Sequence, residues 1–298
     1  MDYCIGIDLG GTKIEIIALT PSSDVLFRSR VPTPQGNYQA TLDAICSLIE
    51  RTESSIKHPP RSIGIGIPGA ISQETGLIKN ANSTCLIGHP LNKDLSDRLQ
   101  RPIKIANDAD CFTLSEAVDG SGKHYNSVFG VILGTGVGGG IVINKQLLSG
   151  PNSICGEWGH NPLPRLDESD GIGRDCYCGK QDCIETFLSG PGFTNHYNHS
   201  TFSHLDTESI WELAKTRDKS AIGHCDLYID QLAKALSSVI NILDPEVIVL
   251  GGGLSNQMDI YTKLPERLAQ YVFSDSMNTP ILKAQYGDSS GVRGAAWL

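Results

Sequence analysis

The sequence predicts an α/β protein of two domains. Its 298 residues exceed the usual size of one domain, and 40% of them are hydrophobic, which is ample for a packed core. β-type apolar runs alternate with stretches of helical periodicity along the chain. A strand, a glycine-rich turn and a second strand occur once in each half. We therefore expect a duplicated fold with a ligand cleft between its halves.

The charge balance excludes several classes of partner. The formal net charge is −9, whereas nucleic acid and anionic membranes call for a basic surface. No segment approaches the roughly 20 apolar residues of a membrane-spanning helix, and the first residues lack the pattern of a secretory signal. We expect a cytoplasmic protein that acts on small molecules, with no nucleic-acid or membrane partner.

The first glycine turn follows an apolar run at the N-terminus. Residues 3–9 and 14–19 are predicted strands, which makes the unit a hairpin and not a P-loop or a dinucleotide-binding turn. Glycines at its tip would let backbone N–H groups approach phosphate oxygens, and Asp8 could hold Mg²⁺ through water. An ordinary tight hairpin explains the same residues equally well. The turn consists of Gly10, Gly11, Thr12 and Lys13.

A helix and a buried strand follow the hairpin. Apolar residues at helical spacing predict a helix over residues 39–56, and residues 62–67 are a fully apolar strand that ends at a Pro-Gly turn. Ligands of α/β sheets gather at such strand ends. The segment 80–84 is dense in hydrogen-bonding side chains, which a polyhydroxyl ligand needs and a surface loop also tolerates. Asn82 is its candidate substrate ligand.

A further strand, residues 103–106, leads into Asn107 and Asp108. A carboxylate at a strand tip, beside an amide that orients a hydroxyl, is well placed to accept a proton during group transfer. Asp108 is therefore the candidate general base. The alternative is that an acidic residue caps the helix expected to begin near Cys111, and Asp110 suits that role better than Asp108.

The second half repeats the plan of the first. A Gly-Ser-Gly linker at residues 120–122 marks the expected boundary between domains 1–120 and 121–286, and the small-residue tail 287–298 is expected to pack back on the first domain. We expect a phosphate between the two glycine turns. The second half is predicted to contain strands 127–133 and 141–143 around the turn 134–140, helices 186–197, 207–216 and 226–243, and strand 247–250 with three glycines after it.

The segment from His160 to Glu185 gathers soft-metal ligands between glycines and prolines. Cys176, Cys178 and Cys183 occur in one turn-rich loop, and His160 is the nearest imidazole. Three thiolates and one imidazole suit tetrahedral Zn²⁺, and four protein ligands leave no open position, so the metal would be structural. A disulfide and free thiols are the alternatives. Disulfides are rare in the cytoplasm, and an odd trio of cysteines cannot pair completely.

Together these motifs resemble the repressor, open reading frame, kinase (ROK) family of sugar kinases over essentially the whole chain. Residues 156–160, Gly-Glu-Trp-Gly-His, followed by residues 176–179 and 183–185, are similar to that family's signature and zinc motif. The resemblance implies an actin-like ATPase (ribonuclease H-like) fold of two domains with a cleft between them. Within the family, the chain most resembles bacterial fructokinases that also act on mannose. Three segments carry this resemblance: residues 79–84, 160–164 and 287–294.

The resemblance also implies roles for single residues. Asp108 matches the catalytic base, and Asp8 matches the carboxylate on the magnesium side. Sugar-hydroxyl ligands are matched by Asn107, Glu157, His160 and Glu185. Nucleotide loops are matched by Gly10, Gly11, Thr12, Lys13, Thr135, Gly136, Gly252 and Gly253.

Two residues of the metal loop raise questions of their own. His160 would bind zinc with one ring nitrogen and face the sugar with the other. Asp182 departs from the family pattern, because it stands where the family usually has glycine before the last cysteine. A left-handed backbone there would tolerate aspartate, so we expect the metal site to persist.

The implied activity is phosphorylation of a hexose by ATP, with Mg²⁺ and a structural Zn²⁺ as cofactors. Fructose, at its 6-hydroxyl, is the first expectation for the acceptor, and N-acetylglucosamine or glucose is the alternative on the same scaffold. A sugar-sensing transcription regulator is an alternative of another class. Such regulators carry a helix-turn-helix segment ahead of the first hairpin, and only seven residues precede Asp8 here. A homodimer is compatible with the sequence.

Overall fold

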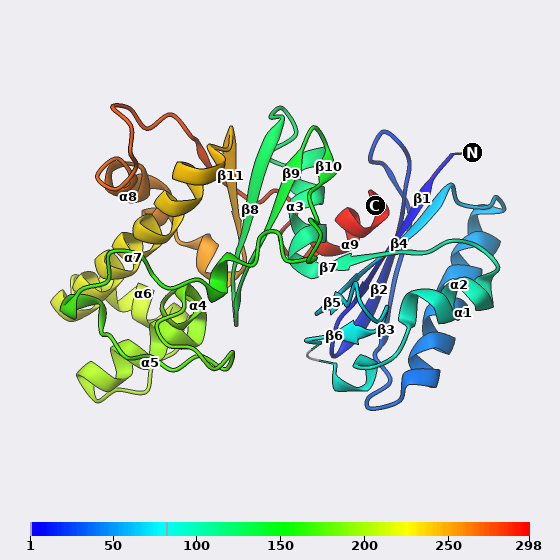
Figure 1. The fold of residues 1–298 in the computed structure, drawn as a ribbon, viewed down its shortest axis with the longest axis horizontal. Coiled ribbons are helices and arrows are strands. Elements are labelled where there is room, and N and C mark those ends of the chain that lie inside the picture. Colours follow the sequence, from blue (N-terminus) through cyan, green and yellow to red (C-terminus); the bar gives the residue numbers. More distant parts are fainter. Residues whose placement is uncertain (1, 82) are drawn as a thin grey trace. The chain divides into compact units, whose positions relative to one another are not determined.

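A computed structural model describes residues 2–81 and 83–298 and shows two five-stranded sheets with helices around them (Figure 1). The chain forms two compact units. The first comprises Met1–Asn126, Gly140–Cys155 and Gln285–Leu298, and the second comprises Ser127–Gly139 and Gly156–Ala284. In the part of the chain that the structure describes, no helix combines the length and the apolar character that crossing a membrane requires.

The first sheet has the strand order β3-β2-β1-β4-β7. β1 and β2 form an antiparallel hairpin in which Leu9 pairs with Ile14, which confirms the predicted hairpin. β4 runs parallel to β1, and β7 runs parallel to β4, so the carboxyl ends of these strands meet at one edge. The strands are β1 (Cys4–Leu9), β2 (Lys13–Leu19), β3 (Val25–Pro32), β4 (Ser62–Ile67) and β7 (Lys104–Asn107).

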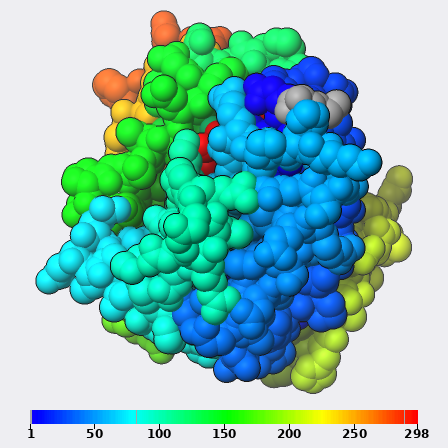
Figure 2. Space-filling view, turned by 90° about the vertical axis from the view of Figure 1, so that its right-hand side faces the viewer, coloured from blue at the N-terminus to red at the C-terminus, as the bar shows by residue number. Residues whose placement is uncertain are grey.

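Helices cover both faces of the first sheet. Leu42, Ile45 and Ile49 of α1 join the buried core that the strands form on one face, and the surface of α1 and α2 forms much of the view in Figure 2. α9 packs on the opposite face with Ile17 and Leu19 of β2. The elements of this unit are completed by α1 (Tyr38–Ile56), α2 (Leu91–Leu99), α3 (Asp108–Val118), α9 (Ser290–Ala296), β5 (Ala70–Ile71), β6 (Ile78–Lys79), β10 (Gln146–Leu147), η1 (Thr84–Leu86) and η5 (Gly287–Ser289).

The C-terminal helix lies directly on the sheet because two neighbouring strand residues are glycines. Gly6 and Gly64 pair across β1 and β4, and a Cβ atom at either position would overlap the α9 backbone. The buried Glu116 carboxylate fixes the segment that leads into α9. Its Oε2 accepts the N–H of Gln285 at 3.0 Å, and its Oε1 accepts the Ser290 hydroxyl at 2.8 Å.

The second sheet has the order β10-β9-β8-β11-β12 and repeats the order of the first. β11 runs parallel to β8, β12 runs parallel to β11, and β10 is antiparallel to β9. The repeated order confirms the predicted duplication. The strands are β8 (Ser127–Leu133), β9 (Val137–Ile143), β11 (Val247–Gly251) and β12 (Ile281–Lys283).

Several predicted elements of the second half need correction. The helix expected over residues 186–197 is two helices, because Ser189 ends α4 and caps α5 with its hydroxyl, which accepts the N–H of Gly192 at 3.1 Å. α7 begins at Lys219 rather than Asp226, since Asp218 caps it. The helices are α4 (Ile184–Leu188), α5 (Gly190–Thr201), α6 (Thr207–Lys215), α7 (Lys219–Leu243) and α8 (Met258–Leu268), with η2 (Trp158–His160), η3 (Glu168–Asp170) and η4 (Gly253–Asn256).

The boundary of the first unit differs from the expected residue 120. Residues 121–126 and 140–155 belong to the first unit as well. Lys145 explains this, because its ammonium group donates to the carbonyl oxygens of Ala117, Lys123 and Tyr125 at 2.7, 2.7 and 3.0 Å. These bonds tie the strand end after β9 to the end of α3. A linker of small residues therefore does not mark the division.

Candidate active site

Asp108 is held at the carboxyl end of β7 by the start of α3. Asn107 caps this helix, since its Oδ1 accepts the N–H of Ala109 at 2.9 Å and its Nδ2 donates to the carbonyl of Gly69 at 3.1 Å. Asp108 Oδ1 lies 2.9 Å from the same N–H. The expectation that Asp110 caps a helix starting near Cys111 is wrong, because β7 runs straight into the helix. Asp108 is the first helical residue.

Asp8 belongs to the same corner of the first unit. Burial and the charge of Asp108 raise the pKa of Asp8 to about 6. The carboxylates of Asp8 and Asp108 repel each other, and a divalent cation bound beside them would relieve that repulsion. Gly291 of α9 borders the site, because a Cβ atom at that position would lie 3.6 Å from Asp8 Oδ2. The residues present therefore fit a magnesium site.

Hydrogen bonds from within the first unit hold the first glycine turn, and the tip of the turn is exposed to solvent. The N–H of Gly10 donates to the carbonyl of Lys13 at 3.0 Å and closes the turn. Thr33 Oγ1 donates to the carbonyl of Gly10 at 2.7 Å, and Gln35 Nε2 donates to that of Gly11 at 2.6 Å. Gly11, Thr12 and Lys13 are exposed. The turn therefore presents a fixed backbone to solvent.

The second glycine turn is shorter than the sequence suggested. The N–H of Gly134 donates to the carbonyl of Gly136 at 3.0 Å, and β9 already begins at Val137, so the expected turn 134–140 is wrong beyond Gly136. Gly138 and Gly139 are strand residues beside Trp158, and Gly139 makes room for its ring. Its Nε1 donates to the carbonyl of Gly138 at 3.0 Å, and a Cβ at Gly139 would lie 2.8 Å from its ring.

A cavity of about 760 Å³ opens beside this turn, within the second unit. Its volume is in the range of small-molecule sites. The third glycine turn borders it, where Gly252 has a φ of 83° and packs against the backbone of Leu133. The polar lining of the cavity was not predicted, because Thr135, the segment of α5 and α6, and η4 come from three separate parts of the chain. The lining includes Thr135, Asn195, Glu208, Gly253, Asn256 and Gln257.

The predicted metal ligands come together in one cluster. One donor atom from each of His160, Cys176, Cys178 and Cys183 lies within 4.8 Å of all the others. The Cys178 and Cys183 sulfurs are 3.6 Å apart, as are Cys176 Sγ and His160 Nδ1. Zn–S bonds of about 2.3 Å place tetrahedral ligands about 3.5 to 3.8 Å apart. The cluster therefore fits zinc, and its three cysteines are free of disulfides in the structure.

The backbone around the cysteines suits a metal as well. A hydrogen bond from the backbone N–H of Lys180 lowers the pKa of Cys178, which favours the thiolate. Asp182 has a φ of 55°, as expected for the position where the family has glycine. Its Oδ1 accepts the N–H groups of Gly173 and Arg174, both at 2.8 Å. The aspartate thus adds two bonds that glycine could not make.

Glu185 connects the metal loop with the second glycine turn. Its Oε2 accepts the N–H of Val137 at 2.8 Å. A Cβ atom at Gly136 would lie 2.7 Å from the same oxygen, which explains the glycine. Glu157 is exposed beside η2 and makes no capping bond. Glu185 and Tyr177 line one cavity of about 650 Å³ in the second unit.

The two units each hold part of the predicted residue set. Asp8, Asn107, Asp108 and the first turn lie in the first unit, while Glu157, His160, Glu185, the second turn and the third turn lie in the second. Asn82, the remaining candidate, lies outside the described residues.

Comparison with known proteins places the chain in a family. The model of the ROK family matches residues 4–298. The chain belongs to the ROK family. An N-acetyl-D-glucosamine kinase of Salmonella typhimurium is 42% identical over 298 residues, which cover 98% of each protein. The ROK hexokinase of Thermus thermophilus has a TM-score of 0.89 at 28% identity, with 99% of this chain and 97% of that chain covered.

The solved ROK structures include proteins of more than one kind. A ROK glucokinase of Streptomyces griseus, solved with glucose and AMPPNP, has a TM-score of 0.76 at 25% identity, with 99% of this chain and 98% of that chain covered. The present ROK protein shares their two-domain, actin-like α/β fold, which confirms the predicted fold class. A ROK transcriptional regulator superposes with a TM-score of 0.84 at 20% identity. At that identity the likeness concerns the fold alone.

Proposed function

We propose that this ROK protein is an ATP-dependent kinase whose acceptor is N-acetyl-D-glucosamine. The observation that carries the choice of sugar is the 42% identity, over 98% of both chains, to a kinase of that sugar. The identity favours this alternative over fructose, the first expectation from the sequence. Fructose stays the second candidate, because residues 160–164, His-Asn-Pro-Leu-Pro, resemble the bacterial fructokinases.

The proton of the reacting hydroxyl is accepted by Asp108 in this proposal. The sugar 6-hydroxyl attacks the γ-phosphorus of ATP, its proton passes to an oxygen of Asp108, and ADP leaves. The cap formed by Asn107 holds the Asp108 backbone in place, which is what a general base needs. Mg²⁺, when bound near Asp8, supplies positive charge to the phosphate oxygens.

The glycine turns hold the nucleotide. The backbone of the exposed residues Gly11, Thr12 and Lys13 in the first turn and of Thr135 in the second is suited to phosphate oxygens, and Gly136 follows Thr135 in that turn. The cavity beside Thr135 and Gly253 is suited to the base and ribose, because polar side chains line it and glycine lets backbone approach closely. Glu157, His160 and Glu185 of the second unit and Asn107 of the first supply the sugar's hydrogen-bond partners.

Zinc serves as a structural ion in this proposal. Four protein ligands fill a tetrahedral site, so no open position remains for chemistry. Protein purified without chelators is expected to contain one zinc per chain by atomic emission, and Cys178→Ser is expected to lower that content. Protein that is fully active with a zinc content near zero contradicts this part.

A sugar-specificity series tests the choice of substrate. Steady-state kcat/KM is measured side by side for N-acetyl-D-glucosamine, glucose, mannose and fructose with MgATP. We expect the highest value for N-acetyl-D-glucosamine. A clear preference for fructose restores the second candidate, and phosphorylation of none of the four sugars contradicts the kinase proposal itself.

A further inference from the structure

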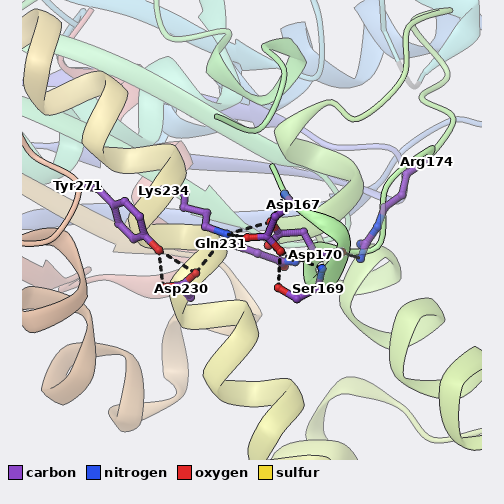
Figure 3. Close-up of polar contacts among 8 residues, drawn as sticks. All are labelled: Asp167, Ser169, Asp170, Arg174, Asp230, Gln231, Lys234 and Tyr271. Atoms are coloured by element: carbon purple, nitrogen blue, oxygen red, sulfur yellow. Dashed lines mark hydrogen bonds and ion pairs between the residues drawn. The ribbon is translucent and has the colours of Figure 1, made fainter. Parts of the chain in front are cut away.

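Lys234 is buried within α7, and its ammonium group lies among three carboxylates (Figure 3). Nζ is 2.9 Å from Asp170, 3.2 Å from Asp167 and 3.3 Å from Asp230. The side chains of Lys234 and Asp170 are 4% and 0% exposed. Asp230 is on α7 itself, whereas Asp167 and Asp170 belong to the loop between the first two metal ligands. The buried ion pair therefore joins the metal loop to the helix.

The cluster is completed by neutral partners. Gln231 Nε2 donates to Asp170 Oδ1 at 3.2 Å, and Tyr271 Oη donates to Asp230 at 2.9 Å. Burial lowers the pKa of Lys234, but the hydrogen bonds with Asp170 and Asp167 outweigh it, so that the pKa is raised. The ammonium group therefore stays charged. Removal of either partner from such a buried ion pair is strongly destabilising, because the remaining charge would be buried without an opposite charge.

The loop is also held along its length by groups that are not metal ligands. A capping box surrounds η3. The Asp170 side chain accepts the N–H of Asp167, and the Asp167 side chain accepts the N–H of Ser169. Arg174 donates to the carbonyls of Asp170, Gly171 and Thr186 at 2.7, 2.9 and 2.9 Å. Its guanidinium group stacks 4.0 Å from the ring centre of Phe187. These bonds run from the Lys234 cluster to α4, next to Glu185.

We propose that Lys234 and Asp170 form a latch that holds the loop 161–175 in the shape its metal ligands need, with or without zinc. Without the latch, the loop would become ordered only when the metal binds. The entropy lost in that ordering would then weaken metal binding. A latched loop offers the ligands already in place. Lys234 is thus a positioning residue for the metal site and, through Arg174 and Thr186, for Glu185. Only this last step rests on the proposed kinase function.

Metal-free protein gives the first test. Wild type is compared with Lys234→Met, which keeps an unbranched side chain, one atom shorter, and removes its charge. After zinc is stripped with a chelator, hydrogen exchange over residues 163–175 and tryptic cleavage after Arg165 are measured. We expect slow exchange and little cleavage in wild type, and at least tenfold faster exchange in Lys234→Met. Wild type that loses its protection on stripping, or a variant that keeps it, overturns the latch.

Zinc release gives the second test. Transfer of zinc from the loaded protein to a chromophoric chelator is followed over time. Groups that hold metal ligands from behind typically change metal affinity about 10- to 100-fold, and we expect Lys234→Met to release zinc faster by a factor in that range. Equal release rates overturn the latch. If wild type binds no zinc, the zinc proposal fails while the metal-free test still decides the latch.

Two further variants make the result interpretable. Lys263→Met is the matched control, because Lys263 pairs with Asp226 and Asp259 at 2.8 and 3.5 Å on α7 and α8 and is 44% exposed. It is expected to match wild type in both tests. Asp167→Ala removes the 57% exposed partner of Lys234 and spares Asp170. It is expected to shift both readouts in the same direction by less, and it serves as the test if Lys234→Met does not fold.

Discussion

The hydroxyl of Tyr177 lies 2.9 Å from Nε2 of His160. The other ring nitrogen, Nδ1, lies 3.6 Å from Cys176 Sγ and therefore faces the metal cluster. The two rings meet edge to face, with centroids 5.2 Å apart. The nitrogen that the sugar was expected to use thus already has a partner, and this partner is a side chain that is 84% exposed. A sugar hydroxyl that binds His160 has to replace the Tyr177 hydroxyl.

Tyr177→Phe is therefore expected to bind the sugar more tightly. The net value of one hydrogen bond, about 0.5 to 1.5 kcal/mol, corresponds to a two- to tenfold lower Kd. Isothermal titration with N-acetyl-D-glucosamine in the absence of nucleotide measures it, with zinc content determined in parallel to show that the metal loop is intact. Weaker binding by this variant would mean that the Tyr177 hydroxyl contacts the sugar instead of competing with it.

Asp108→Asn is expected to lower kcat by about 10² to 10⁴, the range for loss of a general base, because an amide cannot accept the proton. The KM for the sugar is expected to change little, since asparagine keeps the shape of the side chain and can still bond to the N–H of Ala109. Steady-state kinetics with both substrates varied separate these effects.

Asp110→Asn is the comparison variant for this experiment. It neutralises a carboxylate in the same first turn of α3, and we expect its kcat to stay within about tenfold of wild type. If the large loss occurs in Asp110→Asn and not in Asp108→Asn, the base has been assigned to the wrong carboxylate.

Asp8 is expected to make stability depend on pH. Its pKa is about 6 in the folded protein, raised by burial and by the charge of Asp108 from a usual value of 3.8. Between these two values the folded state binds more protons than the unfolded state, so the free energy of unfolding falls as pH rises from about 4 to 6. Below this window both states are protonated and the penalty vanishes.

The matched measurement compares wild type with Asp8→Asn in the absence of divalent cations. Asparagine is neutral at every pH, so this variant is expected to have the higher Tm at pH 7, by a few degrees, with the difference shrinking toward zero near pH 4. A constant difference across this range would mean that the ionisation of Asp8 does not control it.

Asp182 is expected to contribute to the metal loop through both its backbone and its side chain. Asp182→Gly keeps the left-handed backbone but loses two bonds to the N–H groups of Gly173 and Arg174, a loss of about 1 to 3 kcal/mol. Asp182→Ala adds about 1 to 2 kcal/mol of backbone strain. Asp182→Asn keeps an acceptor oxygen and tolerates the backbone.

Thermal unfolding of the zinc-loaded variants therefore predicts an order of Tm values: wild type, then Asn, then Gly, then Ala. If Asp182→Gly is as stable as wild type, the two side-chain bonds contribute nothing and the residue simply tolerates a turn that glycine also fits.

Much of the fold could be predicted from local patterns. The helical period of its apolar residues predicted α1, and apolar runs next to glycine turns predicted β4 and β8, each at or within one residue of the observed ends. The metal cluster was also predictable, since three cysteines within eight residues can meet through turns alone. The exceptions began where a tertiary contact decided the element. Trp158 instead of a phosphate explains Gly139. The cap of α3 by Asn107 instead of Asp110 is a local bond between residues two apart, which the helix pattern did not indicate.

The sequence by itself determined the ROK fold, through the order of its motifs along the whole chain. It also determined the cysteine and histidine candidates and the strand tip that carries Asp108, because these depend on short segments of the chain. Only the tertiary structure decided the partners that come from distant segments. Lys234 meets Asp170 across 64 residues, and Glu185 meets Val137 across 48. Such pairs depend on which helix packs against which loop, and the periodic pattern of a segment shows which face is buried but not which residue it meets. The sequence from His160 to Glu185 therefore predicted the candidate metal ligands, but it did not predict the latch proposed between Lys234 and Asp170.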